Sequence, residues 1–217
     1  MKVGTDGVLL GAWAPVDDAK RILDVGTGTG LIALMLAQRS DSTIDAVDID
    51  EQACGEAKFN FEQSGWSDRL RVFHTDFQVF ANAQNEPYDL IVSNPPFFIN
   101  SLKTGNAALA VARHNDMLTF SQLVYGARKL LSSVGRLCII IPSASRVEFR
   151  ESARLAGFYL RNQTMVIPKS GRVPKRVLME FVVQSCYSID NEIVVLDENG
   201  LYTETYKTLT APFYLAF

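Results

Sequence analysis

The sequence has few cysteines, few histidines and no long apolar run, and each shortage argues against a class of protein. The three cysteines, Cys54, Cys138 and Cys186, are scattered among 217 residues, so we expect free core thiols in a reducing compartment rather than a disulfide framework. Two histidines without paired cysteines give no metal-site spacing. No apolar run reaches the roughly 18 residues that span a bilayer. The first residues also lack the charged-then-apolar order of a signal peptide, so we expect a cytoplasmic protein.

Positive charge is also scarce, because the formal net charge is −3 and a strongly basic domain is the usual mark of nucleic-acid binding. The local distribution of positive charge differs from what the net charge suggests. A Gly- and Pro-containing loop between the apolar runs 164–167 and 177–183 carries four cations: Lys169, Arg172, Lys175 and Arg176. These cations either contact phosphates or form the solvated tip of a hairpin, and the sequence leaves both interpretations open.

Apolar segments that alternate between strand and helix patterns predict an α/β protein with a doubly wound, seven-stranded and mostly parallel sheet. Two last strands, beginning at Tyr159 and Val177, predict an antiparallel hairpin at the sheet edge. The aromatic residues within 187–217 indicate that this tail packs back on the sheet. No linker or repeat divides the chain, so we expect one domain over residues 1–217, with a lid over residues 98–112.

A glycine-rich loop follows the first strand pattern, at residues 22–25. It places Gly26, Gly28 and Gly30 at alternate positions before a helical run. A dinucleotide fingerprint needs G-x-G-x-x-G, so the G-x-G-x-G spacing favours a ligand without phosphates. The second strand ends at Asp48, 18 residues after Gly30, close to the ~20 at which an acid meets a ribose hydroxyl in dinucleotide folds.

The tetrapeptide Asn94-Pro95-Pro96-Phe97 follows another strand pattern, at residues 88–93. It should lie at the carboxyl end of that strand, where open α/β sheets bind ligands. An amide, free proline carbonyls and a flat phenyl ring together suit an exocyclic amine on a planar ring. Taken alone, the tetrapeptide is equally compatible with a plain Pro-Pro turn.

The glycine loop, the acid and the NPPF tetrapeptide, in this order, resemble the class I S-adenosylmethionine-dependent methyltransferases that methylate amino groups. The resemblance implies a Rossmann-like fold and S-adenosyl-L-methionine as the cofactor. It implies Asn94, Pro95 and Phe97 as the catalytic residues that hold the target amine. The cofactor residues that we expect are Thr5, Asp6, Asp24, Gly26, Gly28, Gly30, Asp48, Ile49, Asp76, Phe77 and Asn94.

Both ends of the chain give a closer resemblance. Residues 1–13 and 202–214, with Ala112-Arg113-His114 in family order, are similar to the bacterial tRNA adenine N6-methyltransferases that modify adenine 37 of valine tRNA. That family carries an aromatic and basic segment before the opening motif, and this sequence starts at the motif itself. The resemblance implies a tRNA substrate, and we expect a monomer. Arg113 is then an RNA contact or a lid-anchoring ion pair.

Other functions stay open at this point. The same tetrapeptide serves methylation of other planar amines, such as guanine N2 or adenine N6 in ribosomal RNA, adenine in DNA, or a glutamine side chain in a protein. A module that binds cofactor and RNA without turnover is a further alternative. A nicotinamide dehydrogenase is disfavoured by the glycine spacing.

Overall fold

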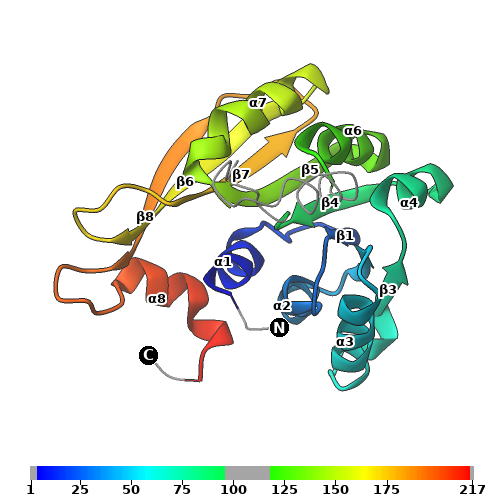
Figure 1. The fold of residues 1–217 in the computed structure, drawn as a ribbon, viewed down its shortest axis with the longest axis horizontal. Helices are drawn as coiled ribbons and strands as arrows, with labels where there is room; N and C mark the ends of the chain where they lie inside the picture. Colours follow the sequence, from blue (N-terminus) through cyan, green and yellow to red (C-terminus); the bar gives the residue numbers. More distant parts are fainter. Residues whose placement is uncertain (1–3, 96–117, 216–217) are drawn as a thin grey trace, which may run out of the picture.

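The computed structural model describes residues 4–95 and 118–215. An eight-stranded sheet with the order β3-β2-β1-β4-β5-β7-β6-β8 lies at its centre (Figure 1). The strands are β1 (Arg21–Val25), β2 (Thr43–Asp48), β3 (Leu70–His74), β4 (Tyr88–Ser93), β5 (Leu131–Pro142), β6 (Tyr159–Lys169), β7 (Arg176–Val182) and β8 (Ile189–Leu196). The helices are α1 (Thr5–Trp13), α2 (Leu31–Arg39), α3 (Glu51–Glu62), α4 (Phe77–Ala83), α6 (Phe120–Leu130), α7 (Arg146–Leu155) and α8 (Glu204–Thr210).

The strand pairing confirms the doubly wound α/β fold and corrects the strand count. Strands β3, β2, β1, β4 and β5 are parallel, and β7 runs antiparallel to both β5 and β6. Strand β8 is an eighth strand, parallel to β6, that the sequence interpretation missed. Its first four residues are exposed and only Ile193 is buried, so it lacks the apolar pattern of the inner strands. The expectation that the tail packs back on the sheet is confirmed.

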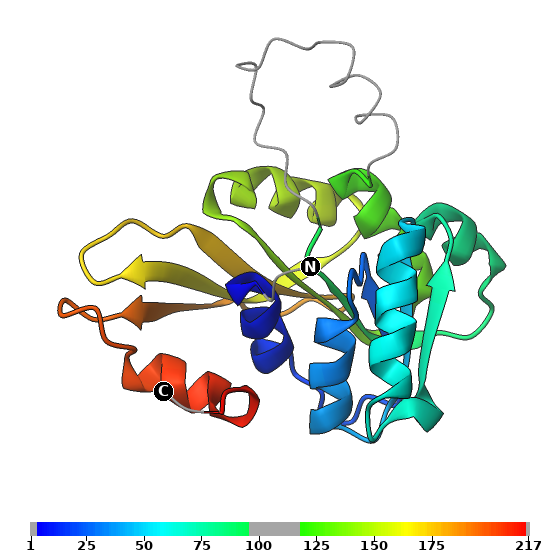
Figure 2. The same cartoon turned by 60° about the horizontal axis from the view of Figure 1, so that its bottom comes forward.

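Two helical layers cover the sheet (Figure 1; Figure 2 brings the second layer forward). Helices α4, α6 and α7 pack on one face, where Phe149 and Phe181 belong to one apolar cluster. Helices α1, α2, α3 and α8 cover the other face, where Leu10, Phe61 and Tyr206 belong to a second cluster. Strands β1, β5 and β7 contribute to both clusters with alternating residues, as expected of a sheet buried on both sides.

Local caps explain two of the helix starts. Asp50 accepts hydrogen bonds from the backbone of Gln52 and Ala53 at the start of α3. Thr119 and Gln122 form a capping box at the start of α6. The sequence interpretation began α6 at Met117, whereas the helix begins at Phe120. The lid expected over residues 98–112 lies outside the described residues.

The cysteines are free, as predicted, but not all of them lie in the core. Cys54 and Cys138 are buried, and Cys186 is exposed in the segment between β7 and β8. Across residues 4–95 and 118–215, no helix has the length and apolarity to cross a membrane.

The sheet register places the basic loop at the same edge as the parallel strand ends. Pro142, at the end of β5, pairs with Arg176, and Arg176 pairs in turn with Val166 of β6. The β6–β7 loop therefore lies at the carboxyl edge of the sheet, where the glycine loop and Asn94 follow β1 and β4.

Candidate active site

A cavity of about 480 Å³ opens at the carboxyl ends of β1, β2 and β4. Its volume is in the range of small-molecule sites. The predicted site residues on its wall are Gly26, Gly28, Asp48, Ile49, Asp76, Phe77, Asn94 and Pro95. The structure thus brings together residues from four separate segments of the sequence.

The glycine loop is held by the neighbouring strand. Gly26 and Thr27 donate backbone hydrogen bonds to the Val47 carbonyl. Gly26 has a φ of +72°, and a Cβ built on it meets no atom within 4 Å, so its backbone faces open space on the cavity wall. Gly30 is different: its φ is +81° and a Cβ there would lie 2.5 Å from Phe61. Gly30 is therefore required by packing, and it does not line the cavity.

Asp48 joins the second strand to the glycine loop. Its Oδ2 accepts the Gly28 N–H at 2.8 Å, and its Oδ1 accepts the Asp50 N–H at 3.0 Å. The next residue, Ile49, is 54% exposed and lies on the wall, where it offers an apolar surface to a flat group. The Asp48 carboxylate and the apolar Ile49 side chain thus lie next to each other, an arrangement that suits the polar ribose and the flat base of a nucleoside.

The third strand contributes Asp76 and Phe77. Asp76 Oδ1 accepts the backbone N–H groups of Gln78 and Val79 and so caps α4. The buried ring of Phe77 fills the space beside Gly126 of α6, because a Cβ on that glycine would overlap the ring. Packing of α6 against α4 therefore fixes this end of the cavity.

Asn94 lies on the cavity wall with Pro95. Its Oδ1 is buried and has no hydrogen-bond partner among the described residues. The preceding residue, Ser93, is buried and donates its hydroxyl to the Val25 carbonyl at 2.8 Å, which ties β4 to β1 beside the glycine loop. A buried oxygen without a partner is costly unless a ligand supplies a donor. Phe97, the last residue of the tetrapeptide, lies outside the described residues.

Asp24 lies behind the cavity wall rather than on it. The side chain is fully buried, and its Oδ2 accepts the Thr27 hydroxyl at 2.6 Å. Its Oδ1 has no partner in the described part of the chain. Burial raises the pKa of Asp24 to about 7, the Thr27 hydrogen bond opposes this shift, and nearby Asp48 adds to it. A protonated carboxyl therefore supports the glycine loop at acidic pH.

The start of α1 reaches the cavity through its glycines. Gly4 and Gly7 are on the wall, whereas Thr5 and Asp6 are not. Asp6 instead accepts a hydrogen bond from Arg176 Nε at 2.6 Å, within an ion pair that joins α1 to β7. Arg176, expected as an RNA contact, therefore also holds the helix that closes one side of the cavity.

The other cations of the basic loop remain near this edge. Lys169 ends β6, and Arg172 and Lys175 are exposed. The Lys175 carbonyl accepts the Ser143 N–H, and the Pro174 carbonyl accepts the Ser143 hydroxyl, so the loop is fixed to the end of β5. Arg113 lies outside the described residues.

Several wall residues were missed by the sequence interpretation: Gly4, Gly7, Thr27, Thr29, Leu31, Ile32, Val25, Val47, Asp50, Ala53, Thr75, Ser93 and Leu118. Thr27 and Thr29 stand between the three glycines of the loop, so the loop itself was their signal. Gly7 packs against Leu31, since a Cβ there would lie 3.2 Å from that side chain. Its position within an apolar helix gave no signal for a ligand.

A family model described as "Methyltransferase small domain" matches residues 4–153, a range that includes the glycine loop and Asn94. The chain belongs to the methyltransferase small domain family. A relative from Bacteroides thetaiotaomicron, the "tRNA1(Val) (adenine(37)-N6)-methyltransferase", is 46% identical over 99% of this chain and 91% of its own length.

Solved structures agree with the methyltransferase fold. A predicted O-methyltransferase from Agrobacterium tumefaciens superposes with a TM-score of 0.74 at 18% identity, over 95% of this chain and 96% of its own. Magnesium protoporphyrin IX methyltransferase from Synechocystis PCC 6803, solved with bound SAM, gives a TM-score of 0.52 at 17% identity, over 75% of this chain and 69% of its own.

S-adenosyl-L-methionine is the cofactor of this methyltransferase, and the cavity residues fit it. The open backbone at Gly26 suits the methionine part, and the Asp48–Ile49 pair suits a nucleoside. The described residues contain no group of three or more His, Cys, Asp or Glu side chains that could hold a metal ion.

Proposed function

We propose that this methyltransferase transfers the methyl group of S-adenosyl-L-methionine to the N6 amine of adenine 37 in valine tRNA. Support comes from the Bacteroides thetaiotaomicron tRNA1(Val) (adenine(37)-N6)-methyltransferase, which is 46% identical over 99% of this chain. The observation that carries the proposal is the buried Oδ1 of Asn94 on the wall of the glycine-loop cavity, which has no hydrogen-bond partner among residues 4–95 and 118–215. An amine proton supplies the donor that this oxygen lacks.

The cofactor supplies an electrophilic methyl group on its sulfonium. The amine of adenine is a poor nucleophile because its lone pair is delocalised into the purine. Asn94 Oδ1 and the Pro95 carbonyl accept hydrogen bonds from its two N–H groups, which favours a pyramidal nitrogen and aims the lone pair. Phe97 stacks on the base. Orientation of this kind is worth up to about 7–11 kcal/mol, and no strong general base is needed, since the methylated nitrogen is acidic until it loses a proton.

The remaining site residues hold the cofactor directly or through the loop. Gly26 and Gly28 bind the methionine part, Asp48 binds the ribose, and Ile49, Asp76 and Phe77 enclose the adenine. Thr5, Asp6, Asp24 and Gly30 act from behind the wall, since none of the four lies on it.

Phosphates of the tRNA are contacted by five cations: Arg113, Lys169, Arg172, Lys175 and Arg176. Of these, Lys169, Arg172 and Lys175 belong to a loop fixed beside the carboxyl edge, which supports this role. We propose further that the enzyme is a cytoplasmic monomer with a single domain.

Methyl transfer to defined transcripts tests the proposal. We expect labelled S-adenosyl-L-methionine to methylate unmodified valine tRNA, and expect no product from a transcript in which guanosine replaces adenine 37. Equal labelling of both transcripts would reject adenine 37 as the target. Labelling of ribosomal RNA, DNA or protein, with none of valine tRNA, would favour methylation of another planar amine.

A further inference from the structure

The charges of the chain are separated along the sequence. Residues 118–182, from the start of α6 to the end of β7, contain 11 Lys and Arg but 3 Asp and Glu, a net charge of +8 in a chain whose total is −3. The structure describes every residue of this segment. The segment therefore offers a surface for a polyanion that the overall charge conceals.

Three arginines of this segment follow one stripe of α7. Arg146, Arg150 and Arg154 are spaced four residues apart, which places them above one another on the helix. Phe149 and Ala153, on the adjoining side of the helix, are buried in the core, whereas Arg150 and Arg154 are exposed and Arg146 is partly exposed, so the stripe lies along the solvent edge of the packed side. Arg154 is paired with Glu151 at 2.8 Å. Arg146 and Arg150 have no ion pair or hydrogen-bond partner within the described part of the chain, so both guanidinium groups are available.

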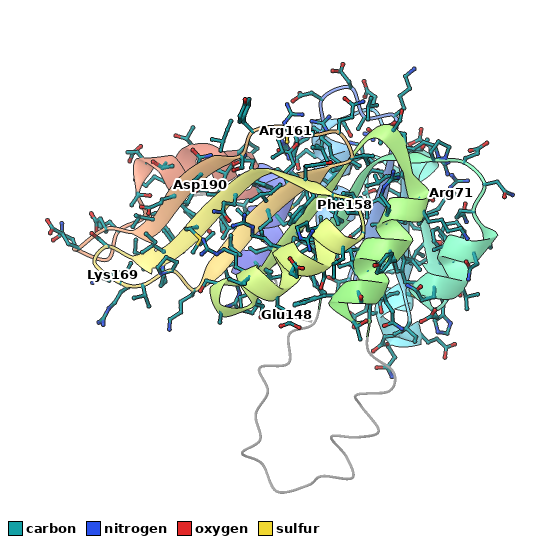
Figure 3. All side chains as sticks on the ribbon, turned by 90° about the horizontal axis from the view of Figure 1, so that it is seen from above. Arg71, Glu148, Phe158, Arg161, Lys169 and Asp190 are labelled. Atoms are coloured by element: carbon teal, nitrogen blue, oxygen red, sulfur yellow. The ribbon has the colours of Figure 1, made fainter. Side chains whose placement is uncertain are left out.

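A groove runs beside this stripe. It has a volume of about 590 Å³ and lies between α7, the start of β6 and the end of β7, with Arg150, Arg154 and Tyr159 among its lining residues. The ring of Tyr159 is 47% exposed. Figure 3 looks onto this face of the molecule, where Phe158 labels the turn between α7 and β6. Guanidinium groups next to an exposed aromatic ring are the combination with which proteins bind RNA strands.

The stripe connects the groove to the active-site edge. Helix α7 starts after Pro142, at the carboxyl end of β5, and ends before Tyr159, which pairs with Val182 at the opposite end of β7. Arg146 and Arg154 are separated by eight residues, or about 12 Å of helix axis. A nucleic-acid strand presents several phosphates over that length. The basic β6–β7 loop, bonded to Ser143, adjoins the active-site end of the stripe.

We propose that the arginine stripe of α7 and the groove between α7 and β6, here called the α7 groove, form a second RNA-binding site that holds the tRNA backbone away from the target adenine. The identity of the RNA rests on the proposed function. Arg146 and Arg150 bind phosphates, and Tyr159 offers its ring to a ribose or base. The α7 groove supplies binding energy for the whole tRNA without contacting the reacting atoms.

Charge reversal tests the α7 groove. The variant is R146E/R150E, and the matched control is K20E/K58E, which makes the same change in net charge on exposed lysines of the acidic remainder of the chain. The dissociation constant of full-length valine tRNA is measured by fluorescence anisotropy at several salt concentrations. Calorimetry gives the affinity for S-adenosyl-L-methionine, and circular dichroism checks the fold.

We expect R146E/R150E to weaken tRNA binding at least about tenfold and to reduce the slope of log Kd against log salt by about one to two. The affinity for S-adenosyl-L-methionine should stay within about twofold of wild type, because neither arginine lies on the cofactor cavity. The milder R146A/R150A replaces the double reversal if that variant does not fold. Binding of tRNA equal to that of K20E/K58E would overturn the proposal.

This outcome is distinct from failure of the proposed function. The position of the methyl group is determined with wild-type enzyme, whereas the α7 groove is tested by binding without turnover. Wild-type methylation of adenine 37 together with unimpaired binding by R146E/R150E would reject the α7 groove alone.

Discussion

At the scale of single residues, Asn94 has the amide oxygen on which the proposed chemistry depends. The oxygen is buried without a partner in the described residues, so it is free to accept a hydrogen bond from an incoming amine. Its neighbour Ser93 is hydrogen-bonded to β1, which leaves the amide little freedom to move. We therefore expect the Asn94 amide to be oriented before any substrate binds.

We expect Asn94→Ala to lower kcat by about 100-fold or more, a loss typical of removing one group that positions or stabilises the reacting atoms. The Kd of S-adenosyl-L-methionine, measured by calorimetry, should change by less than about threefold, because the residue acts mainly on the amine. Asn191→Ala, at the exposed end of β8, is the matched control and should retain full activity. A parallel loss of turnover and cofactor affinity would show that Asn94 is a cofactor ligand instead.

Asp24 gives a pH prediction at the same scale. Burial raises its pKa from 3.8 to about 7. Between about pH 4 and 7 the folded protein therefore keeps a proton that the unfolded chain has already released. Stability from this group is complete below the unfolded pKa and is lost as the pH rises through the folded pKa, by on the order of 4 kcal/mol at most.

Asp24→Asn removes this titration. Relative to wild type, the variant should gain free energy of unfolding as the pH rises from 5 to 7 and then level off. Urea denaturation of both proteins without cofactor, at stepped pH, measures the difference. A difference that does not vary with pH would mean that Asp24 is ionised throughout.

At the scale of elements, two helix glycines make opposite predictions. Gly126 of α6 faces the Phe77 ring on the cavity wall, whereas Gly55 of α3 is exposed and a Cβ there meets nothing within 4 Å. Both lie inside helices, where alanine is favoured over glycine by about 0.5–1 kcal/mol. Packing alone separates the two positions.

Gly126→Ala should therefore destabilise the protein by about 1–3 kcal/mol through overpacking. It should also weaken S-adenosyl-L-methionine binding by about tenfold, because the Phe77 ring is pushed into the cavity. Gly55→Ala should raise stability and leave binding unchanged. Urea denaturation and calorimetry of both variants test the pair, and equal cofactor affinity in the two would refute this role of Gly126.

The sequence predicted the elements with strong apolar patterns and missed those without them. Strand β3 has the predicted limits, and the wall residues from Gly26 to Pro95 come from strand ends that the pattern located. Strand β8 escaped because an exposed edge strand buries little. The start of α6 was recoverable, since Thr119 and Gln122 have capping-box spacing. The ion pair of Asp6 with Arg176 was not, because 170 residues separate the partners.

At the scale of the whole molecule, one sheet joins two halves of the chain. The cofactor half, residues 4–95, contains β1 to β4, and the basic half contains the positively charged segment 118–182. Hydrogen-bonded strands continue from β3 to β8, and apolar clusters on both faces draw residues from the two halves. Unfolding of the strands in one half would expose apolar residues of the other half to water. We therefore expect the cofactor cavity and the α7 groove to unfold as parts of one cooperative unit.

The two tryptophans test this cooperativity, because they report on opposite ends of the sheet. Trp13 of α1 donates its Nε1–H to Thr164 of β6 at 3.1 Å, and Trp66 lies just before β3. Both pack against the same apolar cluster. In Trp66→Phe and in Trp13→Phe, the remaining tryptophan should lose its native fluorescence at the same urea concentration at which far-UV circular dichroism is lost. If the Trp13 signal were lost well before the helical signal, the β6 end would unfold as a separate unit and the single-domain assignment would fail.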